Sequence, residues 1–248
     1  MDLLIDAGNS SIKWAGFEAG VLGSMESVLH EGLENPARLF DSIWEKTLAP
    51  DRVLVSSVAG ESFSDAFKDW VKPAWGCPVT FVQPQSEACG VVNGYTEPEK
   101  LGVDRWLALI GARSLTQDAV IIIDAGTAIT VDAINNQGRH LGGVIAPGLK
   151  MMQASLKETS GIKLEIQANK FQCPANNTEQ AIFSGVHNAV VGMINQTMDL
   201  IQEKIKTPTQ FFITGGDAKY LLPVLANQYQ YEPALVLHGL AKVAGETQ

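Results

Sequence analysis

Short apolar runs alternate with stretches of helical periodicity along this sequence, and the alternation predicts an α/β fold. Strands are expected at residues 2–6, 12–17, 53–55, 79–82, 120–124, 129–134 and 211–213. Helices are expected at 34–48, 63–70, 104–114, 148–156 and 178–204, with a short helix after 215–217 and an apolar segment at 236–243. A turn-rich stretch from Gly90 to Pro98 comes before the helix at 104–114.

The pattern starts again near the middle of the chain. Leu-Ile-Asp-Ala-Gly-Asn-Ser at 4–10 is matched by Ile-Ile-Asp-Ala-Gly-Thr-Ala at 122–128, nearly half the chain length further on. In both places the aspartate ends an apolar strand, and a return strand follows the glycine. The second return strand leads into a turn at 135–138. We therefore predict an internal duplication, with a cleft between the two halves.

Both Asp-Ala-Gly loops have the composition of a phosphate site. A phosphate is held by converging backbone N–H groups, which requires small residues with unusual φ and ψ, and Gly8 and Gly126 supply them. Asp6 and Asp124 repel phosphate themselves, so we expect each to hold a cation that bridges to it. Further donors, and the positive charge of a lysine, come from Asn9, Ser10, Ser11, Lys13, Thr127 and Thr130. For either loop taken alone, a plain strand-ending turn is the alternative.

Other nucleotide motifs are missing from the sequence. It contains no GxxxxGK[ST] P-loop, and no GxGxxG follows the first strand. A third glycine turn, Ile213-Thr214-Gly215-Gly216-Asp217, also follows an apolar strand. A flat ring can lie against such a backbone, so this turn suits the adenosine end of a nucleotide.

The stretch from Tyr95 to Arg105 is the candidate acceptor site. Asp104 and Arg105 follow Gly102 at the expected start of a helix. Asp104 is suited to accept a proton from an acceptor hydroxyl, and the forked guanidinium of Arg105 is suited to bind a carboxylate. The alternative is structural, with Asp104 capping the helix and Arg105 pairing with a surface acid.

Composition narrows the class of protein further. With 46% hydrophobic and 18% charged residues the chain is expected to be globular, and its net charge of -9 disfavours nucleic-acid and anionic-membrane partners. No leader pattern and no apolar run of about 20 residues is present, so neither secretion nor a membrane span is expected. The three cysteines form no CxxC pair and the four histidines show no metal-binding spacing. We expect a cytoplasmic protein with reduced thiols.

Over essentially its whole length the chain resembles the type III pantothenate kinase family, which belongs to the actin-like ATPase and sugar-kinase superfamily. The segment 6–13, Asp-Ala-Gly-Asn-Ser-Ser-Ile-Lys, resembles the first phosphate motif of that family, and 124–128 resembles the second. Tyr95 with Gly-Val-Asp-Arg at 102–105 resembles the pantothenate motif, in which Val103 replaces a commoner alanine. The segments 142–148, 177–178 and 213–217 also fit.

The resemblance implies two duplicated ribonuclease H-like (actin-like ATPase) domains, 1–115 and 116–248, with a cleft between them. It implies transfer of the γ-phosphoryl of ATP to pantothenate, giving 4'-phosphopantothenate in the first step of coenzyme A biosynthesis. The implied ATP contacts are Asp6, Ala7, Gly8, Asn9, Ser10, Ser11, Ile12, Lys13 and Thr127. The implied pantothenate contacts are Tyr95, Gly102, Val103, Asp104, Arg105 and Thr178, with Asp104 as the catalytic proton acceptor.

The resemblance also implies cations and a partner subunit. A monovalent cation, K⁺ or NH₄⁺, is expected at Asp124, and Mg²⁺ is expected with the nucleotide near Asp6. The family is homodimeric, and the long apolar-faced segment 178–204 is the expected source of much of the interface.

Three alternative functions remain open. A phosphatase or acetate-kinase-like member of the superfamily, or another small-molecule kinase, would carry similar phosphate loops. The chain could instead be a non-catalytic accessory regulator of the same family. Arg105 favours an acceptor that is an acid with a separate hydroxyl, and the presence of Lys13 and Asp104 favours a kinase over a regulator.

Overall fold

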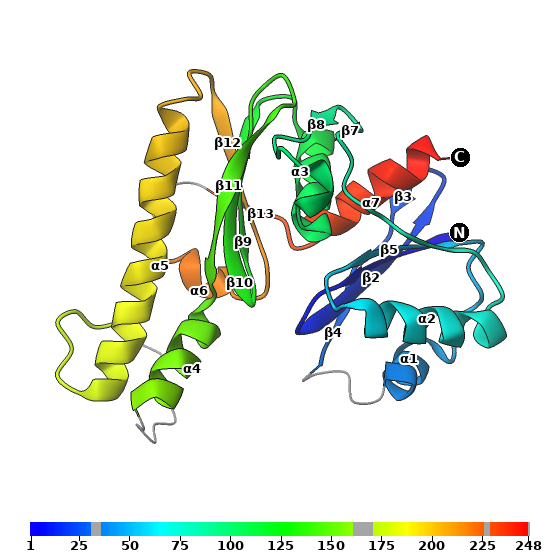
Figure 1. The fold of residues 1–248 in the computed structure, drawn as a ribbon, viewed down its shortest axis with the longest axis horizontal. Coiled ribbons are helices and arrows are strands. Elements are labelled where there is room, and N and C mark those ends of the chain that lie inside the picture. Colours follow the sequence, from blue (N-terminus) through cyan, green and yellow to red (C-terminus); the bar gives the residue numbers. More distant parts are fainter. Residues whose placement is uncertain (31–35, 161–170, 226–228, 248) are drawn as a thin grey trace. The chain divides into compact units, whose positions relative to one another are not determined.

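The structure is a computed structural model that describes residues 1–30, 36–160, 171–225 and 229–247 (Figure 1). The chain forms two compact units. The first comprises Met1–Gln117, Gly138–His140 and Ala234–Gln248, and the second comprises Asp118–Gln137 and Leu141–Pro233. The domain boundaries expected from the sequence, 1–115 and 116–248, stay a prediction. The first two residues of the helix expected at 34–48 lie outside the described residues.

The first unit is built on a sheet with the strand order β3-β2-β1-β5-β6, and β4 pairs with β2. These strands are β1 (Asp2–Ala7), β2 (Ser11–Glu18), β3 (Val21–Leu22), β4 (Glu26–Leu29), β5 (Val53–Ser57) and β6 (Val79–Phe81). β1 runs antiparallel to β2 and parallel to β5. Helices α1 (Pro36–Trp44) and α2 (Glu61–Ala74) cover one face, where Phe40, Trp44 and Phe67 are buried against β1 and β5. A small hairpin, β7 (Glu87–Ala88) with β8 (Val91–Val92), and a 3-10 turn η1 (Pro98–Lys100) follow.

Helices α3 (Val103–Leu115) and α7 (Leu235–Glu246) pack together in the first unit and contact β1 and β5 (Figure 1). Glycines allow the two helix backbones to approach closely. A Cβ added to Gly111 would lie 2.1 Å from the Leu235 carbonyl oxygen, and one added to Gly239 would lie 2.1 Å from that of Leu107. The helix at the end of the sequence is therefore part of the same compact unit as its beginning.

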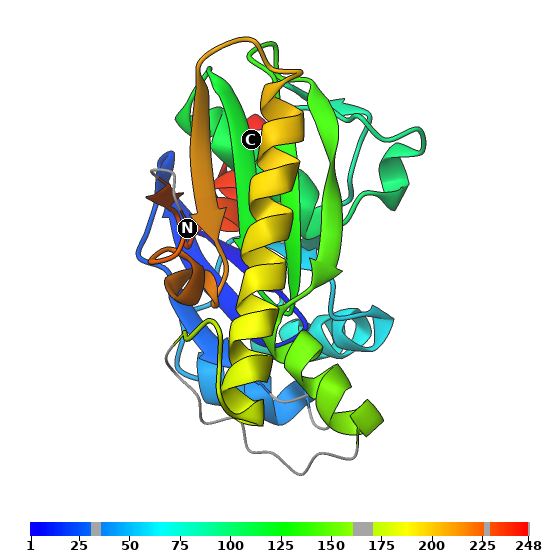
Figure 2. The ribbon, with the colours of Figure 1, turned by 90° about the vertical axis from the view of Figure 1, so that its left-hand side faces the viewer.

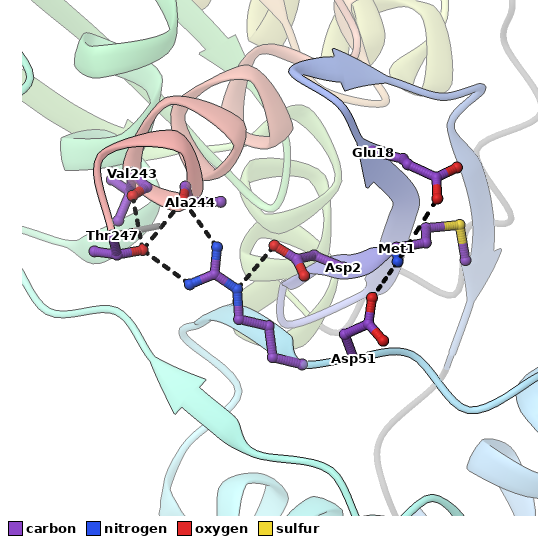
Figure 3. A network of polar contacts seen from close by, with 8 residues as sticks. Met1, Asp2, Glu18, Asp51, Val243, Ala244 and Thr247 are labelled. Carbon is purple, nitrogen blue, oxygen red and sulfur yellow. Dashed lines mark hydrogen bonds and ion pairs between the residues drawn. The ribbon is translucent and has the colours of Figure 1, made fainter.

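Arg52 ties the end of α7 to β1 (Figure 3). Its Nε donates to Asp2 Oδ2 at 2.8 Å, its Nη2 to the Ala244 carbonyl at 2.8 Å, and its Nη1 to Thr247 Oγ1 at 3.0 Å. The guanidinium thus binds a carboxylate of β1 and, together with the Thr247 hydroxyl, donates to the Ala244 carbonyl in the last turn of α7. The α-amino group of Met1 bonds to Asp51 beside this network.

The second unit repeats this sheet. Its strands are β9 (Ala119–Ala125), β10 (Ala128–Ile134), β11 (His140–Pro147), β12 (Thr209–Thr214) and β13 (Gln230–Tyr231), in the order β11-β10-β9-β12-β13. Its helices are α4 (Leu149–Ser160), α5 (Thr178–Gln202) and α6 (Ala218–Leu221). Figure 2 shows α5 lying along one face of the sheet, where Val186, Val190, Ile194 and Met198 are buried against β9 and β10. The apolar face of α5 is therefore already covered by its own sheet.

The predicted duplication is confirmed by topology. β9 pairs antiparallel with β10 and parallel with β12, as β1 pairs with β2 and β5. The predicted strands and helices are present with small shifts of their ends, whereas the sequence reasoning missed β3, β4, β7, β8, β11, β13 and the helix α7. Among the described residues, no helix is both long and apolar enough to cross a membrane.

Candidate active site

Strand alternation and register decide where Asp6 points. Side chains alternate between the faces of a strand, and Leu3, Ile5 and Ala7 pack toward α1 and α2. Asp6 therefore belongs to the opposite face, the one contacted by α3 and α7. In the ladder Asp6 lies opposite Lys13 on β2 and opposite Ser56 on β5.

The pKa of Asp6 is raised from 3.8 to about 6, and the largest cause is burial. Lys13 lowers the pKa through its positive charge, Asp104 raises it through its negative charge, and the Ser56 hydroxyl lowers it. The Ser56 hydroxyl is fully buried but has no hydrogen-bond partner of normal geometry among the described residues, so it acts on Asp6 as a nearby dipole. Three predicted site residues, Asp6, Lys13 and Asp104, are thus close enough to interact electrostatically within the first unit.

The first phosphate loop is the tight hairpin turn between β1 and β2. The backbone N–H of Gly8 donates to the Ser11 carbonyl at 2.9 Å, and Asn9 and Ser10 form the exposed tip. His30, which sequence reasoning did not select, contacts this turn twice. Its backbone N–H donates to the Ser10 carbonyl at 3.0 Å, and its ring Nε2 lies 3.1 Å from the Gly8 carbonyl oxygen.

Asp104 lies in the first turn of α3, and its Oδ1 accepts a hydrogen bond from the backbone N–H of Arg105 at 2.8 Å. Asp104 is not the N-cap residue of α3, which is Gly102 without a side-chain cap hydrogen bond. The negative charge of Asp104 acts on Asp6 and raises the pKa of that carboxyl. Gly102 makes room for the Asp104 side chain, because a Cβ added there would lie 2.6 Å from Asp104 Oδ1. A larger residue at 102 would displace this carboxylate.

Arg105 is buried, with 6% of its surface exposed, which contradicts the alternative of a surface ion pair. Its Nη1 donates to the Tyr95 hydroxyl at 2.7 Å, so two predicted acceptor residues are in direct contact. The Tyr95 ring stacks on His140 with centroids 5.9 Å apart. The Asn93 side chain accepts from the Tyr95 N–H at 2.9 Å and donates to the carbonyls of Gln85 and Pro98, which fixes the loop.

His140 and Asn93 were not selected from the sequence. The Asn-Gly dipeptide at 93–94 marks a turn, but nothing in the sequence predicts that the Asn93 amide reaches residue 98. His140 is separated from Tyr95 by a whole helix and two strands, so no local pattern predicts their stacking. Both were found through three-dimensional contacts alone.

Two other glycine-containing segments of the second unit, 142–148 and 213–217, closely approach the second phosphate loop. Asp124 lies opposite Thr130 on β10 and Thr214 on β12, the positions equivalent to those of Lys13 and Ser56 around Asp6. A Cβ added to Gly215, whose φ is +91°, would lie 2.5 Å from Asp124 Oδ1. One added to Gly148 would lie 2.5 Å from the Thr127 carbonyl oxygen. The glycines at 148 and 215 thus permit the close approach that brings three separate motifs together.

Thr178, a predicted pantothenate contact, lies in the second unit at the exposed first turn of α5. Asn177 caps this helix by accepting the Gln180 N–H at 2.9 Å. A groove of about 500 Å³ runs beside Thr178 between α4 and α5. Its lining is mostly apolar: Met152, Ser155, Leu156, Thr178, Ala181, Ile182, Gly185, Val186 and Ala189.

Neither aspartate belongs to a dense metal-binding cluster. Within the described ranges, no group of three or more His, Cys, Asp or Glu side chains is arranged to hold a metal ion. Each loop does contain one carboxylate, Asp6 in the first and Asp124 in the second.

The repeated sheets, each with an Asp-Gly hairpin loop, define an actin-like ATPase or sugar-kinase fold. Solved structures share it across nearly the whole chain. One, described as a Baf family transcriptional activator from Campylobacter jejuni, is 22% identical with a TM-score of 0.64 and coverage of 99% of this chain and 98% of that one. Another, the activator of the 2-hydroxyisocaproyl-CoA dehydratase from Clostridium difficile with bound ADPNP, is 13% identical with a TM-score of 0.58, covering 99% and 94%. These likenesses establish the fold.

Sequence comparison establishes the family. Residues 2–200 match the family model of type III pantothenate kinase. The type III pantothenate kinase of Nitrosococcus oceani is 37% identical over 253 residues, covering 100% of this chain and 95% of that protein. The chain belongs to the type III pantothenate kinase family.

Proposed function

We propose that this protein transfers the γ-phosphoryl of ATP to the primary hydroxyl of pantothenate, giving 4'-phosphopantothenate and ADP. Family membership supports the reaction. The structural observation that carries the residue assignment is the electrostatic proximity of Asp6, Lys13 and Asp104. It relates the phosphate loop to the proposed proton acceptor within one compact unit.

Asp104 is the proposed proton acceptor. The pantothenate hydroxyl oxygen attacks the γ-phosphorus, the bond to the β–γ bridging oxygen breaks, and the hydroxyl proton passes to the Asp104 carboxylate. Arg105 binds the pantothenate carboxylate, and Tyr95 holds the guanidinium in place through the 2.7 Å hydrogen bond. Gly102 and Val103 border this acceptor position, and Thr178 is the proposed contact from the second unit.

The nucleotide phosphates are proposed to lie against residues 6–13 and Thr127. Lys13 supplies positive charge to the β- or γ-phosphate, and the loop supplies backbone N–H groups. Mg²⁺ near Asp6 would neutralise charge on the phosphates, and a monovalent cation, K⁺ or NH₄⁺, would be held at Asp124. The closeness of the 215–217 turn to Asp124 supports the proposal that this turn receives the adenosine end.

We further propose that the protein is a cytoplasmic homodimer. The apolar side of α5 is used within its own unit, so a dimer would form through the outward side of α5 and the α4–α5 groove. Ala181, Gly185 and Ala189 line that groove, and their small side chains permit close approach of a second helix. Sedimentation analysis of the purified chain tests this proposal, and a monomer at micromolar concentrations would contradict it.

The decisive assay is coupled ADP release with pantothenate, run in sodium and then in potassium. We expect turnover that depends on pantothenate and is higher in potassium. Asp104→Asn should bind ATP with wild-type affinity but lose phosphoryl transfer, and wild-type turnover in this variant would contradict its assignment as proton acceptor. Asp124→Ala should remove the activation by potassium, so an unchanged salt dependence would contradict its role as cation ligand.

The same assay separates the alternatives. Absence of turnover in either salt, with ATP still bound, would favour a non-catalytic regulator. ADP release that requires a different hydroxyl acid would favour another small-molecule kinase, and release of phosphate without an acceptor would favour a phosphatase.

A further inference from the structure

His30 is brought to the first phosphate loop by strand pairing. It follows β4, which pairs with β2 so that Leu29 lies opposite Ser11. This register carries the backbone N–H of His30 to the Ser10 carbonyl and its ring Nε2 to the Gly8 carbonyl, at 3.0 Å and 3.1 Å. Two carbonyl groups of one tight turn are thus held by a single residue.

The contact between His30 and the Gly8 carbonyl fixes the direction in which the next backbone N–H, that of Asn9, points. A carbonyl oxygen only accepts, so Nε2 carries the ring proton and donates it to Gly8. The Gly8–Asn9 peptide is planar and trans, so its C=O and N–H point in opposite directions. The Asn9 N–H therefore points away from His30. Within the described part of the chain it has no acceptor, and Asn9 is exposed.

We propose that His30 is a positioning residue of the phosphate loop, which holds the Gly8 carbonyl so that the Asn9 N–H is presented to a nucleotide phosphate. The inference rests on the proposed function, because it takes residues 6–13 as the phosphate site. A donor oriented before binding needs no ordering when the nucleotide arrives. If the peptide turned over, a carbonyl oxygen would face the same position, and it would repel phosphate.

The orientation of Gly8 matters because glycine itself restrains this peptide weakly. With no Cβ, Gly8 has access to a wide range of φ and ψ, so its peptide plane needs an external restraint. On its N–H side Gly8 is held by the hydrogen bond to the Ser11 carbonyl, and on its carbonyl side His30 Nε2 lies 3.1 Å from the oxygen. The imidazole supplies the restraint on that side.

The test compares side chains that keep or lose a donor at the Nε2 position. In His30→Gln the amide nitrogen reaches about as far as Nε2, whereas in His30→Asn it stops near the position of Nδ1. His30→Met has the length of glutamine but no donor. Leu29→Ala is the matched control, because Leu29 is 82% exposed at the last position of β4, directly before His30.

Affinity for Mg·ATP without acceptor, measured by calorimetry on the full chain, is the primary measurement. We expect His30→Asn and His30→Met to bind Mg·ATP about 5- to 20-fold more weakly, as for loss of one hydrogen bond to a charged group. His30→Gln and Leu29→Ala should stay within about twofold of wild type. The KM for pantothenate should be unchanged in all four, which a general loss of structure would not produce.

The proposal would be overturned if the glutamine, asparagine and methionine variants all bound Mg·ATP as tightly as wild type. It would also be overturned if all three bound Mg·ATP more weakly by the same factor. Either His30→Asn or His30→Met, whichever folds, is sufficient for the comparison with His30→Gln, because neither places a donor at the Nε2 position. Mg·ATP binding is measured without pantothenate, so a failure of the acceptor assignment leaves this result interpretable. If the wild-type chain binds no Mg·ATP, both the proposed function and this inference are wrong.

Discussion

Asp6→Asn should make the protein more stable while abolishing its activity. The pKa of Asp6 is raised to about 6 from an ordinary 3.8, mainly by burial, with a further contribution from the negative charge of Asp104. At neutral pH the carboxylate is thus held ionised in a place that disfavours the charge. Asparagine keeps the shape and removes the charge.

The magnitude follows from the shift in pKa. A change of about two units corresponds to about 3 kcal/mol at 1.36 kcal/mol per unit. Asp6 is not completely shielded from solvent, so we expect a gain of about 1–3 kcal/mol in the free energy of unfolding above pH 7. For a chain of this size that corresponds to roughly 2–4 °C in melting temperature for each kcal/mol.

The pH dependence gives the sharper test. Because the folded-state pKa is raised, the folded protein binds a proton more tightly than the unfolded chain between pH 3.8 and about 6. The stability due to the protonated carboxyl is fully present below 3.8 and is lost as pH rises through about 6. The advantage of Asp6→Asn should therefore grow across this interval and become constant above it.

Urea unfolding from pH 4 to pH 8, without nucleotide and with a chelator present, measures this difference. Asp65→Asn is the control, because the Asp65 side chain is 75% exposed and its replacement should change stability by less than about 0.5 kcal/mol. A less stable Asp6→Asn at pH 8, or an advantage that does not vary with pH, would refute the assignment of a strained buried charge. Adding Mg·ATP should stabilise wild type more than the variant.

Three further predictions concern packing and the acceptor site. Arg52→Leu should lower the free energy of unfolding by about 1.5–3 kcal/mol in urea titrations, since it leaves polar groups on β1 and α7 without their partner, whereas Asp65→Ala should cost less than about 0.5. Gly239→Ala should cost more than about 2 kcal/mol because its Cβ would meet a backbone carbonyl at 2.1 Å, while Gly245→Ala in the same helix meets open space and should be neutral or stabilising. Tyr95→Phe should raise the KM for pantothenate about 3- to 10-fold with the KM for ATP unchanged, and equal changes in both would contradict its place on the acceptor side.

The duplicated fold could be predicted because its signals are local. The run Val120–Ile123 is β-branched throughout and ends at Asp124, so a buried strand followed by a loop is the natural interpretation. The match between residues 4–10 and 122–128 then made the second half a repetition of the first. Pairing followed from the short connections, since adjacent strands joined by a tight turn usually pair.

The remaining features depend on contacts that no local pattern contains. The segment of β11 includes Gly142 and Gly143, which have low strand propensity, and it is a strand because β10 lies beside it. The sequence led to no secondary-structure prediction for 236–243, and its local pattern does not show that this segment forms a helix packed on α3. His30 was not selected because β4, the strand directly before it, is short and largely exposed, so the pairing that brings it to Gly8 has no hydrophobic pattern in the sequence.

The two aspartate loops occupy equivalent places, so their differences come from their neighbours. Asp6 has a lysine opposite on one strand and a serine on the other, whereas Asp124 has threonines on both. A lysine beside the aspartate offers charge to a phosphate but competes with a second cation, which favours direct phosphate contact in the first loop. The two threonines opposite Asp124 add neutral oxygen atoms and no positive charge that would compete with a cation. This favours a monovalent cation in the second loop. Divergence at these ladder positions would account for the different roles that we propose for the two repeated hairpins.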